Sequence, residues 1–433
     1  MTPQSHFMVV APVAAGRLEE LRSLLASMNR EVGMVDPLNS LVPFARFDGL
    51  HYARFLIIDD QTLSDIELYG LPRVDYPIYL VFLGDMDGER DAFFPELVQK
   101  AGDGLRRIFA MCEGFSPQSD LQAWMKSHDV APAAFYCNWI GRTVRQVREE
   151  DALRQALEKY AQDNAASLQG MQPREKHVAM RSFVEHEQQA GRLCFTPVPP
   201  TPTAWKLRNS ANLVGVPLIL LVLSPFLLLY LPIFIFQLRR RELSDPEIVP
   251  RVSAAHASEL AAQEDKDVTN QFSAFGSVKP GLFRRRLLIF IMWIIDYSAR
   301  HIYNRGRLAR VTTIHFARWV FLDNERRMLF CSNYDGSLES YMDDFINKVG
   351  FGLNLAFSNG LGYPTTNWLV LDGSRDEQKF KYYLRRHQLP TQVWYNATPG
   401  LSAMDMQRNS RIREGLENSY MTDSETREWL QLL

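Results

Sequence analysis

The chain has 433 residues, which is enough for two to four domains and too long for a small disulfide-stabilised scaffold. Apolar residues make up 46% and charged residues 23% of the sequence, a balance that excludes a wholly disordered or fibrous protein. The 48 Lys and Arg residues nearly balance the 50 Asp and Glu residues, so the net charge of −2 gives no reason to expect a nucleic-acid partner.

The cysteines and the first residues indicate the compartment. Four cysteines are far apart in the sequence and form no CxxC pair: Cys112, Cys137, Cys194 and Cys331. This pattern predicts neither a zinc site nor a disulfide framework, and it is typical of a reducing compartment. The first ten residues, MTPQSHFMVV, lack the basic region of a secretory signal peptide. We therefore expect the chain to begin in the cytosol.

The first part of the chain, residues 1–165, reads as a ferredoxin-like repeat. Stretches of alternating apolar residues predict strands, and apolar residues at helical spacing predict helices. The predicted strands are HFMVVAPV at 6–13, HYARFLIID at 51–59, YPIYLVFLG at 76–84 and the stretch 134–139. The predicted helices are 15–28, 89–111 and a closing helix at 143–165. The order β-α-β-β-α-β is the order of a ferredoxin-like fold.

A helical and proline-rich connector, 166–209, leads to a hydrophobic membrane segment at 210–241. Residues 213–236 carry no charge, a length that suffices to cross the hydrocarbon core of a bilayer. Pro217, Pro225 and Pro232 argue against a straight span, because each removes a backbone donor. We expect a proline-bent re-entrant hairpin in contact with membrane lipid. A buried hairpin of a soluble protein is the alternative.

Two further segments separate this region from the last part of the chain. Residues 242–281 have few aromatic residues and predict a polar linker with one short helix. Residues 282–306 predict a basic interfacial helix, with Arg284, Arg285 and Arg286 among lipid headgroups and Phe290, Trp293 and Ile294 in the acyl layer. A buried soluble helix and a poor second membrane crossing are the alternatives for this segment.

The last part, 307–433, repeats the sequence pattern of the first. HYARFLIID at 51–59 aligns with HFARWVFLD at 315–323, and residues 80–114 align without a gap with 328–362. A third block aligns HDVAPAAFYCN, from His128, with HQLPTQVWYN, from His387. Helices are expected at 337–357 and 401–418. We infer an internal duplication, and two copies that pack together must lie on the same side of a membrane.

The order of elements resembles the dimeric α+β-barrel superfamily over about 1–165 and 310–420. This superfamily includes dye-decolourising peroxidases, chlorite dismutases, isomerases and small monooxygenases. The resemblance implies an α+β fold in which two ferredoxin-like repeats pair into one pseudo-symmetric α+β barrel, here with a central membrane-inserted helical region. It also implies a cavity inside the barrel and an oxidative reaction, with haem as the cofactor to consider.

Matched polar residues on the repeated strands are candidates for catalysis. Arg54 and Arg318 lie among apolar neighbours, where a guanidinium needs an acidic partner or an anionic ligand. The alternative is an ion pair with a carboxylate such as Asp48 or Asp59. His51 and His315 begin the same strands and could transfer protons or bind a metal, although a hydrogen-bonded structural histidine is the alternative.

Two further pairs complete the candidate site. Asp87, in GDMDG at 84–88, matches the GxxDG pattern of dye-decolourising peroxidases, and Asp335 occupies the same place in SNYDG. A turn that begins a helix is the alternative for both. His128 and His387 are candidate cofactor-binding residues, and the alternative is a histidine that caps a helix C-terminus. No metal site is predicted.

We therefore expect a membrane-attached protein with both repeats on the cytoplasmic side, acting on an apolar or lipid-like small molecule. A haem-assisted oxidoreductase of the peroxidase or monooxygenase type is the leading hypothesis. The alternative is a non-enzymatic protein that binds lipid or serves as a membrane scaffold. The sequence predicts no oligomeric state.

Overall fold

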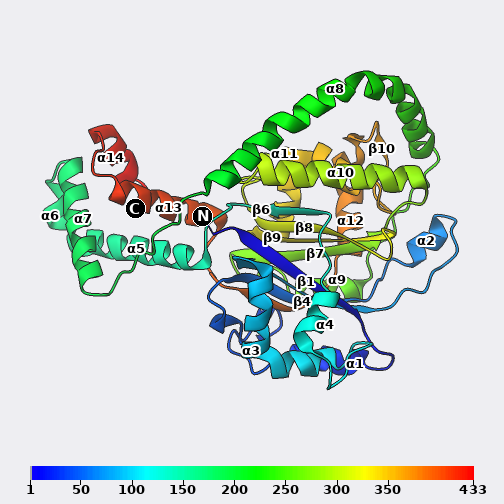
Figure 1. The fold of residues 1–433 in the computed structure, drawn as a ribbon, viewed down its shortest axis with the longest axis horizontal. Coiled ribbons are helices and arrows are strands. Elements are labelled where there is room, and N and C mark those ends of the chain that lie inside the picture. The colour runs from blue at the N-terminus through cyan, green and yellow to red at the C-terminus, as the bar shows by residue number, and fades with distance from the viewer. Residues whose placement is uncertain (1) are drawn as a thin grey trace.

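A computed structural model describes residues 2–433 and shows a mixed α+β fold (Figure 1). Among these residues are 14 α-helices and several antiparallel sheets. Two sheets of four strands form the centre of the molecule, and helices lie above, below and at one end of them (Figure 1). The expectation of an α+β fold is thereby confirmed.

Both large sheets are antiparallel throughout. The first sheet has, in order, β1 (Gln4–Pro12), β5 (Tyr79–Asp87), β4 (Leu50–Ile58) and β12 (Thr391–Asn396). The second has β6 (Ala134–Cys137), β8 (Ile314–Leu322), β9 (Arg327–Asp335) and β7 (Thr269–Ser277). The strands expected near residues 6, 51, 80, 134 and 315 are all present.

The two halves of the chain exchange one strand each. β12, near the end of the chain, pairs with β4 of the first sheet, and Trp394 lies opposite Arg54. β6, from the first part of the chain, pairs with β8 of the second sheet, and Phe135 lies opposite Arg318. Each sheet is therefore completed by a strand from the other half, so neither half has a complete sheet of its own.

The two sheets enclose an apolar core between them. Alternation along each strand places every second side chain in this layer, so Leu56 and Ile58 face inward while Phe55 and Ile57 face the helices. The inner layer combines side chains of both sheets: Met8, Val10, Leu56, Ile58, Val81 and Leu83 with Phe275, Val320, Leu322, Leu329 and Cys331. Packed side chains thus occupy the space where the barrel cavity was expected.

Helices cover the outer face of each sheet. α1 (Leu18–Ala26), α3 (Arg90–Phe109) and α4 (Leu121–Ser127) pack on the first sheet. The second is covered by α10 (Leu282–His301), α11 (Leu338–Phe357) and α12 (Glu377–His387). A separate group at one end of the sheets has its own apolar core (Figure 1). It contains α5 (Val144–Asp163), α6 (Ala165–Gln169), α7 (Pro173–Gln189), α13 (Ala403–Glu417) and α14 (Asp423–Leu430).

Short elements complete the chain. The remaining helices are α2 (Ser64–Leu68), α9 (Ala254–Ala261), the long α8 (Thr203–Glu242) and the 3-10 turns η1 (Phe44–Arg46) and η2 (Gly373–Arg375). Two small pairs of strands join β2 (Asn29–Glu31) to β3 (Met34–Val35) and β10 (Thr366–Asn367) to β11 (Leu371–Asp372).

The predicted polar linker, 242–281, is wrong over its last third. α9 is the short helix expected there, but β7 follows it as an edge strand of the second sheet. The polar residues of β7 are buried, because Ser273 accepts a hydrogen bond from Arg54 and Thr269 donates one to Asp335. The buried side chains of β7 are largely polar and bond to distant segments of the chain. The sequence of this strand therefore lacks the alternation of apolar residues by which a strand is predicted.

The predicted interfacial helix at 282–306 is α10, and one of its faces is buried against the second sheet. Arg284, which was expected among lipid headgroups, is buried and forms an ion pair with Asp245 at 2.5 Å. The opposite face keeps Phe290 and Trp293 exposed. The helix therefore belongs to the folded body and also presents an aromatic surface.

α8 is a single helix of 40 residues, and it is the one helix among residues 2–433 that is long and apolar enough to cross a membrane. The expected helical hairpin is not formed. Pro217, Pro225 and Pro232 all lie inside α8, which arches over α10 and bends back toward the body (Figure 1). None of the apolar stretch is buried by the rest of the protein.

Both ends of α8 are attached to the same body. Near its start, Tyr297 of α10 donates a hydrogen bond to the carbonyl of Asn212 at 3.1 Å, and Asn209 bonds to His301 at 2.6 Å. At its end, the buried carboxylate of Glu242 accepts a bond from the backbone N–H of Leu369 at 2.8 Å. The arch therefore leaves and rejoins the protein on one side.

Cysteine labelling can test this arrangement. In a Cys194→Ser background the other native cysteines are buried, and Ser210→Cys and Arg240→Cys place exposed thiols at the two ends of α8. We expect a membrane-impermeant maleimide to label both positions from the same face of sealed vesicles. Val222→Cys, in the middle of the arch, should react only after detergent is added. Labelling of the two ends from opposite faces would contradict the arch.

Candidate functional site

His51 and Asp87 form a pair that connects the first sheet to α5. A β-bulge between Leu50 and Tyr52 turns His51 out of the regular strand. Its Nε2 lies 2.9 Å from Oδ1 of Asp87, and Oδ2 of Asp87 accepts a bond from the N–H of Val144 at 2.9 Å. Val144 is the first residue of α5. The carboxylate therefore stabilises both the bulge and the start of a helix.

His315 and Asp335 repeat this geometry in the second sheet. A bulge again lies between Ile314 and Phe316, and Nε2 of His315 is 2.6 Å from Oδ1 of Asp335. Oδ2 of Asp335 accepts a bond from the N–H of Ala403, the first residue of α13, at 2.7 Å. Both aspartates therefore hold the closing helices.

The alternative interpretation of the two aspartates, as turns that begin the next helix, needs a correction. The helices that directly follow in sequence are α3 and α11, and their N-cap residues are Glu89 and Ser337. Asp87 and Asp335 instead bond to the first N–H of helices that come more than 50 residues later. Sequence proximity suggested the wrong helix, because the sheets bring the end of one strand beside a distant helix.

The two histidines come together at one end of the sheets. The ring of His51 lies 5.4 Å from that of Phe316, and the ring of His315 lies 5.6 Å from that of Tyr52. Both histidines line a small cavity of about 30 Å³. Arg142 lines it as well and stacks on Trp139 at 4.2 Å. Burial lowers the pKa of Arg142 to about 10.

Arg54 and Arg318 lie deeper, where each reaches across to the opposite sheet. Arg54 donates to the carbonyls of Phe272 and Ser332, both at 2.9 Å, and also bonds to Asn333. Its pKa is lowered by burial. Carbonyl and side-chain oxygens of the second sheet bind both terminal nitrogens of this guanidinium, while its buried Nε has no partner. The two terminal nitrogens are thus not available to an anionic ligand.

Arg318 makes the corresponding contacts in the opposite direction. It donates to the carbonyls of Phe7 at 2.9 Å and Gly84 at 3.3 Å, and it forms an ion pair with Asp85. The alternative of an ion pair with a carboxylate is therefore confirmed for Arg318, but its partner is Asp85 and not Asp48 or Asp59. Asp59 pairs with Arg22 on the surface at 2.8 Å.

His128 and His387 stabilise helix C-termini, as the structural alternative predicted. His128 follows the last residue of α4, and its Nδ1 lies 2.9 Å from the carbonyl of Trp124. His387 is the last residue of α12, and its Nδ1 lies 2.8 Å from the carbonyl of Tyr383. Burial lowers the pKa of His387. Both rings therefore satisfy helix carbonyls that would otherwise be unpaired.

The surroundings of His387 do not fit a haem. The His387 ring packs so closely on Gly276 of β7 that a Cβ placed there would lie 2.5 Å from Cδ2. His128 stacks on Trp124 with a centroid distance of 4.0 Å. Across residues 2–433, no group of three or more His, Cys, Asp or Glu side chains is arranged to hold a metal ion. The protein around His387 thus leaves no space for a porphyrin.

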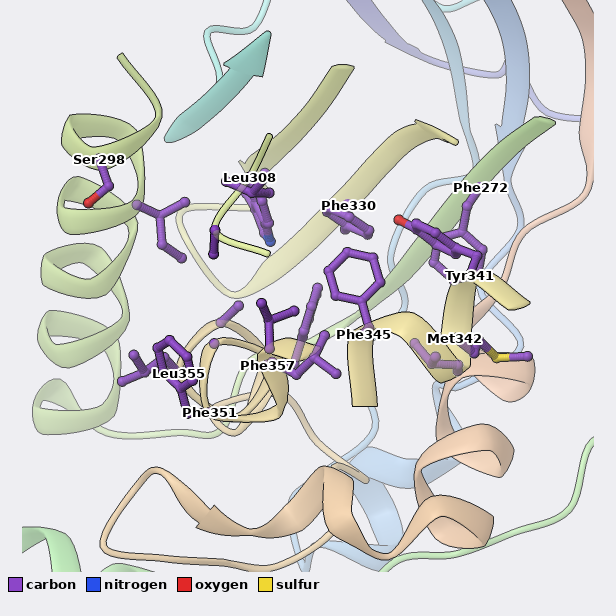
Figure 2. A pocket seen from close by; sticks show the side chains of 18 of the residues that line it. Phe272, Ser298, Leu308, Phe330, Tyr341, Met342, Phe345, Phe351, Leu355 and Phe357 are labelled. Carbon is purple, nitrogen blue, oxygen red and sulfur yellow. The ribbon is translucent and has the colours of Figure 1, made fainter. Parts of the chain in front are cut away.

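A larger cavity lies on the outer face of the second sheet, between this sheet, α10 and α11 (Figure 2). Its volume is about 250 Å³, and its walls are almost entirely aliphatic and aromatic. Figure 2 shows Phe272 and Phe330 reaching it from the strands and Phe345, Phe351, Leu355 and Phe357 from α11. None of the eight candidate residues from the sequence lines this cavity.

The cavity exists because α11 is kinked. Val349 has non-helical backbone angles (φ −141°, ψ 29°), and Gly350 and Gly352 flank Phe351 directly after it. The kink moves the second half of α11 relative to the first, so the helix does not fill the space above β8 and β9. Glycines in a helical pattern are the sequence signal that could have indicated this break.

The mouth of the cavity lies at the surface between α10 and α11. Ile294 of α10 and Phe351 of α11 both line it, yet they are 40% and 59% exposed. Phe290 and Trp293 lie on the exposed side of the same stretch of α10. The opening is therefore next to an exposed apolar surface, on the helix to which the start of α8 is attached.

Removal of one of the bridging aspartates should destabilise the protein. Asp335→Ala deletes the acceptor for His315, Thr269 and the N–H of Ala403, and we expect a loss of about 2–4 kcal/mol in the free energy of unfolding. Urea unfolding of the detergent-purified protein measures it. Asp423, which forms an exposed ion pair with Arg174, is the control. Asp423→Ala should lower the free energy of unfolding by less than about 1 kcal/mol. Equal effects would contradict the structural role of Asp335.

His387 should make stability depend on pH. The folded state binds a proton at this ring less readily than the unfolded chain, whose histidine has a pKa of about 6.5. Stability should therefore fall as pH decreases below about 6.5. His387→Gln should reduce the slope of the free energy of unfolding against pH between pH 7 and 5. His186→Gln, at an exposed position, should leave this slope unchanged. An unchanged slope in His387→Gln would refute this assignment.

No protein-family model, no curated protein and no solved structure matches this chain. The likeness to the dimeric α+β-barrel superfamily thus stays an expectation from the order of elements. The contacts around the small polar cavity and the larger apolar cavity are the observations that bear on function.

Proposed function

We propose that the chain is a membrane-surface protein that binds an apolar, lipid-like small molecule in the cavity between the second sheet, α10 and α11. The observation that carries the proposal is the apolar cavity, whose mouth lies beside exposed aromatic residues of α10. A ligand that dissolves in the bilayer could pass between lipid and cavity without crossing water. Binding would remove the hydrocarbon surface of the ligand from water, which stabilises the complex by about 25 cal/mol for each Å² of apolar surface buried.

We also propose that the two halves are ferredoxin-like repeats that arose by duplication and pair as one barrel with exchanged strands. The element orders β1-α1-β4-β5-α3-β6 and β7-α10-β8-β9-α11-β12 support this, when the short additional elements are left aside. So do the matching bulges at His51 and His315 and the reciprocal contacts of Arg54 and Arg318. In this arrangement α10, with its exposed aromatic face, occupies the place of α1.

The size and lining of the cavity define the class of ligand. A volume of about 250 Å³ is near the lower limit of small-molecule pockets, so it suits one alkyl chain or a small ring system. A phospholipid with two acyl chains is too large. The hydroxyl of Tyr341 bonds to Ser332 at 2.6 Å, so this group does not need a ligand partner. The cavity thus favours hydrocarbon over polar groups.

The position of α8 supports an attachment to one face of the membrane. Its exposed apolar stretch would enter the lipid while both of its ends stay on the body. Exposed basic residues lie near those ends, with Arg208 before the stretch and Arg240 after it. Positive charge on both flanks favours the cytoplasmic side for both ends, and this is the side that we propose for the body.

Binding without catalysis fits the geometry better than oxidation does. The candidate catalytic residues hold the sheets and helices together, and each forms hydrogen bonds with protein groups. His128 and His387 cap helices, and the tightly packed ring of His387 does not fit a haem. We therefore propose the lipid-binding alternative in place of the oxidoreductase.

A side chain that fills the cavity should abolish binding. Gly352 lines the cavity, and a Cβ there would meet one neighbour, Val349, at 4.0 Å, so Gly352→Phe should place its ring in the cavity without a clash. We expect the affinity for the uncharged fluorophore diphenylhexatriene to fall at least about tenfold, equivalent to ~1.4 kcal/mol. Fluorescence titration of the detergent-purified protein measures the affinity.

Asn347→Phe is the matched control, because Asn347 is exposed on the same helix. It adds the same ring outside the cavity and should leave the affinity unchanged. Thermal unfolding shows whether both variants are folded. Equal binding by Gly352→Phe and the native protein would exclude this cavity as the binding site.

A further inference from the structure

A turn with exposed arginines borders the apolar cavity. Leu308 and Ala309 line the cavity, and the backbone of Leu308 bonds in both directions with Val311, at 2.8 and 2.9 Å. These bonds close a tight turn with Ala309 and Arg310 at its tip. Figure 2 shows Leu308 at the same side of the cavity as Ser298 of α10. The turn is thus part of the cavity wall.

The backbone of this turn is strained. Ala309 has a φ of 53°, in the left-handed region that residues with a Cβ rarely adopt. Such a conformation costs on the order of 1 kcal/mol and persists when the surrounding structure enforces it. Here it directs the apolar side of the turn to the cavity while the next residue, Arg310, stays exposed.

The charges on the turn are not compensated. Arg307 directly precedes and Arg310 directly follows the two lining residues, and both arginines are exposed. Within the described chain, neither has an ion-pair partner, whereas Arg300 on α10 pairs with Asp296 at 2.7 Å. An apolar cavity with two exposed, unpaired arginines directly beside two of its lining residues is complementary to a molecule with a hydrocarbon tail and a negative head.

We propose that the ligand of the cavity is a single-chain amphiphile with an anionic head group, which Arg307 and Arg310 bind at the border while the chain lies among the aromatic residues. This inference rests on the proposed function and narrows it to a fatty-acid-like class. Carboxylate and phosphate heads share the required chemistry, because guanidinium groups bind both through paired N–H donors.

The experiment compares two competitors with chains of the same length, one with an anionic carboxylate head and the other with a neutral hydroxyl head. Palmitate and hexadecanol each displace bound diphenylhexatriene from the detergent-purified full chain at pH 8 and low salt. We expect palmitate to bind more tightly than hexadecanol. The double variant Arg307→Gln/Arg310→Gln should weaken the affinity for palmitate about five- to thirtyfold, as expected for the loss of two partly solvated charge pairs. Its affinity for hexadecanol should be unchanged. Salt should reduce the preference.

The control variant is Arg46→Gln/Arg107→Gln, which removes the same charge from exposed positions on the first sheet's side of the molecule. It should keep the preference for palmitate. Equal displacement by palmitate and hexadecanol, with no selective effect of Arg307→Gln/Arg310→Gln, would overturn the anionic head while leaving the cavity as an apolar binding site. Failure of both competitors would overturn the proposed function itself.

A second experiment, with lipid vesicles, distinguishes binding of a single amphiphile in the cavity from binding of the arginines to bilayer headgroups. Flotation with phosphatidylcholine vesicles that contain phosphatidylglycerol reports attraction to anionic lipid surfaces. We expect Arg307→Gln/Arg310→Gln to change palmitate affinity more than vesicle binding, because α8 provides the main attachment. Weaker vesicle binding with an unchanged preference for palmitate would assign the two arginines to bilayer headgroups and overturn the proposal.

Discussion

The exchange of β6 and β12 between the two sheets is the constraint on which the rest of the structure depends. Each exchanged strand bonds to a strand of the other half, and the following helices, α5 and α13, pack on each other at one end. The aspartates that hold these helices come from strands of both sheets. Because the halves share their sheets, the long insertion between them must begin and end on one body, and α8 does so.

The polar groups between the sheets fix how the sheets face each other. Arg54 and Arg318 are buried charges, and burial is favourable only when their N–H groups find acceptors. Each finds carbonyls on the facing sheet, and a shift of one sheet relative to the other would leave several donors unpaired. The matched arginines of the two sequence repeats are therefore best explained as sheet connectors.

The sequence predicted those elements whose side chains alternate in a simple way. β4 and β8 are aromatic and β-branched, and the ends of α3, α5, α11 and α13 follow from helical spacing. β7 was missed because its buried side chains are polar and find their partners in distant segments. The strand exchange could not be predicted, since the residues of a strand specify its two faces and not its neighbours.

The candidate site shows the same limit. The alignment of the two parts of the sequence paired His51 with His315 and Arg54 with Arg318. The members of each pair make similar contacts, but similar geometry in two halves indicates a shared structural task as readily as a chemical one. The cavity depends on the kink at Val349 and on the turn at Ala309, two local backbone features without a periodic pattern. Arg142 was missed because its burial arises from segments distant in sequence.

The exchanged strands also impose an order on biosynthesis. β6 ends at Cys137, whereas its partner β8 begins at Ile314, and the long apolar helix α8 is made between them. At ~5–20 residues per second, the roughly 180 residues in between take on the order of 10–40 s to translate. During this interval the nascent amino-terminal half carries β6 without its partner strand, and its first sheet lacks its edge strand β12, which is made later still. The second sheet can therefore close only after α8 has been made, and the first sheet only after β12 has followed.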